Sequence, residues 1–317
     1  MNKLQQAARL VLSRCLDAKN TESVLVVTDA QMMELARLLY SAATRVSRDA
    51  VLVEVRQGAR DGAEPPAIVS RMMAAADVVL VVTSVQWHHS EARRMACRRG
   101  ARVLSLSGIT ADALRRAVDV DYEELARRTR KLADVLTIGR RAHLTTPAGT
   151  DAWFCLEGKK GIAHTGLVHQ RGGFSTFPAG MACIGPSPEN THGRIVIEHG
   201  LAGYARLDAP VVVDVKEGHA TAVHLPRARA GLRHELRALG PEARTLAELG
   251  IGTNANARIS GCMAEDCKVL GTVHVGLGNN RSFGGTVNVP FHADGILFAP
   301  SLEIDGRVIV RDGQVVL

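Results

Sequence analysis

Side chains that can hold a divalent metal gather in one stretch, from Leu246 to Asp294. Acids, imidazoles and a thiol stand there among many glycines: Glu248, Glu265, Asp266, Cys267, His274, His292 and Asp294. Because alternate residues of a strand point to the same face, the H-x-D pair of His292 and Asp294 can chelate one ion together. Carboxylate oxygens and imidazole nitrogens suit Zn, Mn, Co or Fe. The stretch therefore predicts a site for one or two such ions.

Several neighbours of these residues have two readings each. Four glycines either let the backbone bend around a metal or serve as ordinary hairpin glycines: Gly276, Gly278, Gly284 and Gly285. Three asparagines either orient ligands or cap turns: Asn254, Asn279 and Asn280. Arg281 either fixes a substrate carboxylate or is an exposed loop residue. We take Asn280 and Arg281 as the candidate substrate-binding residues.

Length and composition set the frame for this site. A chain of 317 residues with 46% hydrophobic residues favours two domains, each with its own core. The N-terminus lacks a hydrophobic signal segment and no long uncharged apolar run occurs, so we expect neither a membrane span nor secretion, and a cytoplasmic location. The net charge of +7 is spread over helices that also carry acids, and aromatic residues make up only 3%. This pattern favours a solvated surface over a nucleic-acid site.

The first half alternates short apolar strands with amphipathic helices. Strands are predicted at 23–29, 50–55, 77–83 and 101–106, and helices at 1–20, 31–46, 66–76, 89–99 and 110–135. This order is typical of a parallel sheet covered by helices on both faces. The first strand meets its helix at Thr28-Asp29-Ala30-Gln31 without the glycines that a dinucleotide site needs, so no cofactor is expected there. His88 and His89 are interpreted as surface residues.

The second half has a different texture. Glycine-containing turns divide short β segments, for example at Glu217-Gly218, Asp305-Gly306 and Asp312-Gly313. One helix is predicted at 227–238, continuing toward Ala247. We therefore predict an α/β N-terminal domain with a parallel sheet, residues 1–138, and an α+β C-terminal domain rich in antiparallel strands, residues 139–317.

An ordered set of motifs in the second half resembles the aminopeptidase T family of metallopeptidases, whose relatives include the non-haem iron 2,5-dihydroxypyridine dioxygenases. The motifs are TPAGTD (146–151), FPAG (177–180), ELGIGTN (248–254), KVLGTVHVGLGNN (268–280), H-x-D (292–294) and IDG (304–306). The resemblance is strong over roughly 140–317 and extends to the N-terminal domain only in general layout. It implies a pair of metals held by three glutamates, two histidines and an aspartate. Residues on matching positions are Glu248, His274, His292 and Asp294.

Two family glutamates are replaced in this chain. Met181 follows FPAG, and Cys267 precedes the lysine of KVLGT. Because bridging carboxylates neutralise two cations, their loss should weaken or remove at least one metal position. Glu265 or Asp266 could supplement the four remaining ligands. Cys267 is either an inert buried thiol or, as a thiolate, a soft ligand or nucleophile, and with Glu248 it is the candidate catalytic residue.

Three functions follow. The first is a metal-dependent hydrolase resembling aminopeptidase T, in which metal-activated water attacks an amide-like or ring C–N bond of a small molecule or short peptide. The alternative is a mononuclear non-haem Fe(II) ring-cleaving dioxygenase. Those relatives also lack the glutamate after FPAG, which favours this alternative. However, they have a histidine at the position of Glu248, and their set of three iron ligands would leave His274 without a role, which disfavours it. The third is a metal-free binding protein or pseudoenzyme. The resemblance also implies a homodimer.

Overall fold

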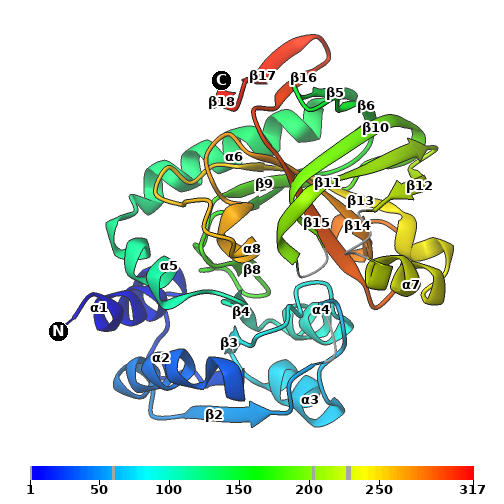
Figure 1. The fold of residues 1–317 in the computed structure, drawn as a ribbon. Coiled ribbons are helices and arrows are strands. Elements are labelled where there is room, and N and C mark those ends of the chain that lie inside the picture. The colour runs from blue at the N-terminus through cyan, green and yellow to red at the C-terminus, as the bar shows by residue number, and fades with distance from the viewer. Residues whose placement is uncertain (1, 59–60, 202–203, 226–229) are drawn as a thin grey trace. The chain divides into compact units, whose positions relative to one another are not determined.

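The computed structural model describes all residues except 1, 59–60, 202–203 and 226–229, and the chain folds into two compact units (Figure 1). The first unit comprises Met1–Ala126, His164–Ala179 and Asn256–Arg258. The second comprises Arg127–Ala163, Gly180–Ala255 and Ile259–Leu317. Within the described residues, none of the helices has the length and apolar character needed to cross a bilayer.

The first unit contains a five-stranded parallel sheet in the order β2-β1-β3-β4-β8, counted over the described residues. The strands are β1 (Val24–Asp29), β2 (Ala50–Val55), β3 (Val78–Val82), β4 (Arg102–Ser105) and β8 (Phe174–Thr176). The helices are α1 (Lys3–Leu10), α2 (Met33–Val46), α3 (Ala67–Ala75), α4 (Glu91–Arg98), α5 (Ala111–Arg116) and the start of α6 (Tyr122–Ile138). Short helical turns cover Val11–Cys15, Ala30–Met32 and Ala117–Asp119. The predicted parallel α/β sheet is confirmed.

The fifth strand of this sheet comes from a distant part of the chain. β8 lies beyond the four strands predicted from the sequence, yet Val103, Leu104 and Ser105 of β4 pair in parallel with Phe174, Ser175 and Thr176. A three-residue strand has too short a pattern to be assigned locally, and its partner is remote in sequence.

The second unit contains a large sheet with antiparallel pairing, which confirms the predicted α+β class. Its path over the described residues is β18-β17-β16-β5-β6-β10-β15-β14-β13-β9-β7, and β11 and β12 extend it from β10. The strands are β5 (Arg141–Thr145), β6 (Asp151–Cys155), β7 (Ile162–His164), β9 (Met181–Ile184), β10 (Ser187–Leu201), β11 (Tyr204–Lys216), β12 (His219–His224), β13 (Leu246–Gly252), β14 (Val273–Gly278), β15 (His292–Leu297), β16 (Ser301–Ile304), β17 (Arg307–Arg311) and β18 (Gln314–Val315). Among the described residues of this unit, the helical segments are the larger part of α6, α7 (Ala230–Ala238), α8 (Met263–Asp266) and the turns at Pro241–Arg244 and Arg281–Phe283.

The turn motifs behave as the sequence predicts. Asp305-Gly306 joins β16 to β17, with φ angles of 51° and 81°, and Asp312-Gly313 joins β17 to β18, with φ angles of 46° and 77°. Two successive positive φ angles are characteristic of the tight turns that suit the twist of a β-hairpin. Aspartate and glycine tolerate this conformation, so the C-terminal hairpins form where they were expected.

The helix predicted to continue toward Ala247 ends earlier. α7 stops at Ala238, and Gly240 adopts φ 80° immediately before Pro241. A left-handed glycine followed by a proline terminates a helix, because the proline cannot donate the next hydrogen bond. The chain then enters β13, so Glu248 lies in a strand. The predicted start of the helix at 227–229 lies outside the described residues.

Candidate metal centre

The central strands of the second unit have two chemically different faces. On one face, directly paired residues are apolar and belong to the unit's core: Ala182, Ile184, Leu249, Ile251, Val273, Val275, Leu277, Ala293 and Leu297. On the other face, the pairing register places Asp294 opposite Gly276 and Gly276 opposite Glu248. The adjacent row contains His274 opposite Gly250. Paired residues of antiparallel strands share a face, so the ligand-type side chains alternate with glycines on this second face, which we call the ligand face.

The glycines of the ligand face make room for the side chains beside them. A Cβ atom at Gly276 would lie 2.9 Å from Nε2 of His292 and 3.0 Å from Oδ1 of Asp294. A Cβ atom at Gly250 would lie 2.2 Å from Nε2 of His274. The neighbouring side chains therefore lie over the glycine backbone, in space that any larger residue would occupy.

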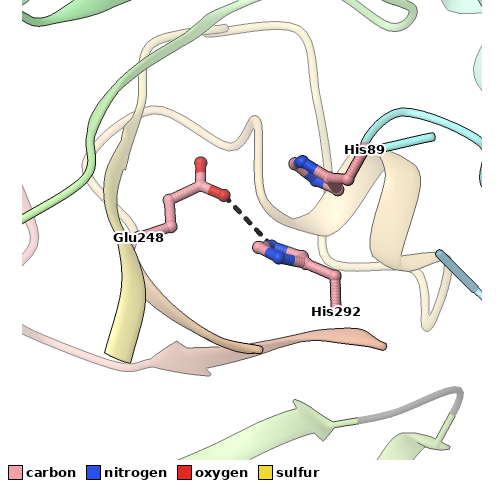
Figure 2. A group of neighbouring side chains, drawn as sticks. All are labelled: His89, Glu248 and His292. Carbon is pink, nitrogen blue, oxygen red and sulfur yellow. Dashed lines mark ion pairs between the residues drawn. The ribbon is translucent and has the colours of Figure 1, made fainter. Parts of the chain in front are cut away.

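Three ligand atoms converge around His292. Its Nε2 lies 3.2 Å from Oε2 of Glu248 (Figure 2) and 3.1 Å from Oδ1 of Asp294. The other ring nitrogen, Nδ1, lies 3.1 Å from the backbone carbonyl of Asn279 and can donate to it. This bond favours the tautomer that turns the Nε2 lone pair toward the two carboxylates. In Figure 2, Glu248 projects from β13 and His292 from β15.

A second group of atoms lacks ordinary partners. Glu248, His274 and Asp294 each offer one ligand atom within 4.8 Å of the others. Oε1 of Glu248 and both ring nitrogens of His274 are buried without a hydrogen-bond partner, although Nε2 of His274 lies 3.5 Å from Oε1 of Glu248. Buried polar atoms are normally satisfied, so these orphaned atoms need an explanation.

A shared cation explains both groups. Ligand atoms about 2.1 Å from one metal lie about 3 to 3.5 Å apart, simply from the bond lengths and angles. The separations of 3.1, 3.2 and 3.5 Å in this cluster match that spacing. The residues present therefore suit a divalent-metal site. Glu248, His274 and Asp294 form one group of mutually close ligand atoms, and His292 adjoins it through Glu248 and Asp294.

The electrostatics of the cluster also favour a positive charge. Burial acts to lower the pKa of His292, but the charge of Asp294 and its hydrogen bonds with Asp294 and Glu248 raise the pKa to about 10. Burial acts to raise the pKa of Glu248, but the nearby imidazoles of His274 and His292 hold it well below the ordinary value. The two carboxylates thus favour a positive charge at this position.

The two replaced glutamate positions are occupied by uncharged groups. Met181 is buried and packs with Cys183 and Phe283 in a small apolar cluster. Burial raises the pKa of the Cys267 thiol well above its ordinary value, and the nearby charge of Asp294 raises it further. A protonated thiol is a poor ligand and nucleophile, so this environment argues for an inert Cys267.

Asp266 and Glu265, the proposed supplementary ligands, form hydrogen bonds outside the metal cluster. Asp266 accepts hydrogen bonds from the backbone of Ser260 and Gly261 and interacts with His199 at 2.7 Å, so its oxygens serve this local network. Glu265 accepts from the hydroxyl of Ser260. Neither belongs to the group of converging ligand atoms among the described residues.

The two candidate substrate residues lie on the loop between β14 and β15. Oδ1 of Asn280 accepts from the backbone of Val287, and its side chain lies over Gly285, where a Cβ would come within 2.1 Å of it. Arg281 is exposed. Asn280 thus stabilises its loop, and the substrate role of both residues stays a prediction.

Three residues at the ligand face were not predicted from the sequence to be part of the site. Cys183 pairs with Gly250, and after burial the charge of Glu248 is the main cause that raises the pKa of its thiol, while Phe283 lies with its ring centre 5.9 Å from that of His292. Lys268 is buried and its ammonium lies 3.2 Å from Sδ of Met181. The alternation of Met181 and Cys183 along a strand could have indicated a shared face, but only the fold brings Phe283 and Lys268 to it.

Together, the fold and the buried cluster define the class of protein as a candidate metalloenzyme. A family model described as NicX, 2,5-dihydroxypyridine 5,6-dioxygenase, matches residues 3–317. The chain therefore belongs to this family. No curated protein matches the sequence.

Solved structures that resemble the whole chain include the following two. A 2,5-dihydroxypyridine dioxygenase from Pseudomonas putida KT2440 has a TM-score of 0.85 and 20% sequence identity, and the match covers 100% of this chain and 98% of that one. Wild-type AmpT from Thermus thermophilus has a TM-score of 0.69 and 16% identity, with 99% of each chain covered. These likenesses show a common fold. The family match favours the ring-cleaving alternative over the hydrolase that the sequence analysis placed first.

Proposed function

We propose that the protein is a mononuclear, iron(II)-dependent dioxygenase that opens a hydroxylated nitrogen-containing aromatic ring. The observation that carries this proposal is the ligand face. Imidazole and carboxylate atoms converge there, and uncharged Met181 and Cys267 stand where the aminopeptidases that the chain resembles have further carboxylates for a second ion. The family match supports the reaction class.

The roles of the chain's own residues follow from their positions. Glu248, His292 and Asp294 would hold the iron, with His274 as the fourth candidate ligand, and the Asn279 carbonyl would keep the His292 ring in the productive orientation. Bound iron(II) would supply open coordination positions for oxygen and substrate. The apolar cluster of Met181, Cys183 and Phe283 would exclude water and provide a flat wall for a ring.

A mononuclear hydrolase is the second candidate, because Glu248 and His274 both stand at positions that resemble those of the aminopeptidases. A set of metal ligands that includes the two carboxylates would also bind Zn or Mn. Under either function, the proposed partner is a small molecule. The homodimer implied by the resemblance stays a prediction.

Oxygen consumption tests the leading proposal. Metal-free protein is loaded anaerobically with iron(II), mixed with 2,5-dihydroxypyridine and exposed to oxygen. We expect oxygen uptake that depends on iron and substrate and is lost in His292→Ala. His224→Ala is the matched control, since His224 is exposed and contacts Asp214 instead of the cluster. Absent oxygen uptake together with zinc- or manganese-dependent cleavage of a leucyl amide would overturn the dioxygenase in favour of the hydrolase.

A further inference from the structure

A buried lysine ammonium lies at the ligand face without an acidic partner. Lys268 is only 5% exposed, and its Nζ lies 3.2 Å from the thioether sulfur of Met181. Among the described residues, no carboxylate lies within ion-pairing distance of this ammonium, although two acids stand elsewhere on the same face. A thioether is a weak acceptor that carries no charge. Buried cations are normally paired, so Lys268 has unused capacity to bind an anion.

The position of Lys268 connects it to the metal cluster. Met181 pairs with Gly252, one row along the ligand face from the pair of Cys183 and Gly250. The charge of Lys268 acts on the thiols of Cys183 and Cys267, and the carboxylates of Glu248 and Asp294 act on the same two thiols. The ammonium and the two carboxylates therefore lie close enough to act on the same two thiols.

The lining of that region suits a ring. Met181, Cys183 and Phe283 form an apolar cluster of their own, separate from the main core. Phe283 extends this cluster to His292, since the two ring centres are 5.9 Å apart. An aromatic ligand on this wall would have the cluster of ligand atoms at one end and the ammonium at another.

Charge balance specifies the sign of the missing partner. A ligating imidazole must be neutral, so a bound divalent ion would be balanced by the carboxylates of Glu248 and Asp294. The positive charge of Lys268 would then still have no ion-pair partner among the described residues. A substrate that carries one negative oxygen would restore neutrality.

We propose that Lys268 forms an anion subsite, which binds the phenolate or carboxylate oxygen of an aromatic substrate whose ring packs on Met181, Cys183 and Phe283. This inference deepens the proposed function by making its substrate an aromatic anion. The subsite itself can be tested by binding alone, without turnover.

Calorimetric binding of benzoate and its neutral counterpart benzamide provides the test. It is carried out on the full chain, both metal-free and loaded with zinc, which does not react with oxygen. Because a charge-assisted hydrogen bond is stronger than a neutral one, we expect wild-type protein to prefer benzoate about tenfold in both states. Lys268→Met should reduce the preference to about onefold, and Lys268→Arg should keep most of it. Lys160→Met, at an exposed lysine, removes the same net charge and should change nothing.

Thermal unfolding separates this role from a structural one. If Lys268 is kept for ligand binding, metal-free Lys268→Met should unfold at the wild-type temperature or above it. Equal affinity of the wild type for benzoate and benzamide would overturn the proposal, as would undiminished preference in Lys268→Met. A preference seen only with zinc would also overturn it, because the carboxylate would then be binding the metal. None of these results depends on oxygen uptake, so a failure of the subsite is distinguishable from a failure of the dioxygenase.

Discussion

Two buried carboxylates, one in each unit, show how differently the same group can be used. In the first unit, Asp29 at the end of β1 is fully buried and accepts from the backbone of Gln31 and Met32 and from the backbone and hydroxyl of Ser84. In the second unit, Glu248 is also buried, but its Oε1 has no hydrogen-bond partner and faces an equally unsatisfied His274.

The difference separates structural from functional burial. Four neutral donors satisfy Asp29, and two of them are the N–H groups at the start of a helix, where a phosphate would bind in a dinucleotide site. The carboxylate of Asp29 thus occupies the N–H groups that would otherwise bind a phosphate. Glu248 is held beside imidazoles and another acid, an arrangement that a shared positive charge stabilises. Burial of Asp29 therefore serves folding, whereas we propose that burial of Glu248 serves the binding of a cation.

Removal of a ligand from the second unit should have the largest effect. Asp294→Ala deletes one of two anionic candidate ligands, and we expect the metal dissociation constant to rise by at least about a hundredfold, since loss of even an outer-shell partner costs 10- to 100-fold. Competition with a chelating dye measures this affinity. Asp29→Ala is the control, and a comparable loss of affinity in that variant would erase the distinction between the two carboxylates.

For the stability of the metal-free protein, substitution of Asp29 should have a larger effect than substitution of Glu248. Asp29→Ala leaves several donors around α2 and Ser84 unsatisfied, so the free energy of unfolding of the metal-free protein should fall by about 2–4 kcal/mol. Glu248→Gln keeps the shape and one accepting oxygen of the side chain, and should lower the same quantity less than Asp29→Ala does. Urea denaturation measures both. A larger loss in Glu248→Gln than in Asp29→Ala would contradict our view of the second unit.

A smaller perturbation tests the glycine spacing of the ligand face. In Gly276→Ala the new Cβ would lie about 3 Å from atoms of Glu248, His292 and Asp294. The side chains must shift by a few tenths of an ångström, and we expect about tenfold weaker metal binding, or about 1.4 kcal/mol. Unchanged affinity would show that the glycine is not needed to seat the ligands. Circular dichroism checks that the fold is retained.

The smallest expected effect concerns acid sensitivity of the first unit. Hydrogen bonds from the backbone and hydroxyl of Ser23 hold the pKa of Asp77 below its ordinary value of 3.8. A lowered pKa in the folded state adds stability that is fully present above the unfolded pKa and is lost as the pH falls through the folded one. The stability advantage of wild type over Asp77→Asn should be constant from about pH 5 to 7 and shrink below about pH 4. An advantage that persists at pH 2 would exclude this linkage.

The sequence predicted what local pattern controls. Apolar runs of four to six residues placed β1 to β4, because period and turn chemistry are local properties. The β8 strand was missed because its partner is remote, and the early end of α7 depended on the left-handed conformation of Gly240.

For the site, residue types and motif order indicated Glu248, His274, His292 and Asp294, and the structure brings their side chains together on one face. That they bind a metal stays a prediction. The contributions of Lys268, Cys183 and Phe283 could not be predicted, since each depends on strand register or on a loop returning over the sheet. Family membership, rather than the ligand types, separates the dioxygenase from the hydrolase.

The central claim is that the ligand face of β13, β14 and β15 binds one divalent ion through these side chains. Elemental analysis of protein purified without chelators and supplied with iron(II) tests it most directly. We predict one equivalent of metal per chain in the wild type and none in His292→Ala. Two equivalents in the wild type, or one equivalent retained in His292→Ala, would contradict the account.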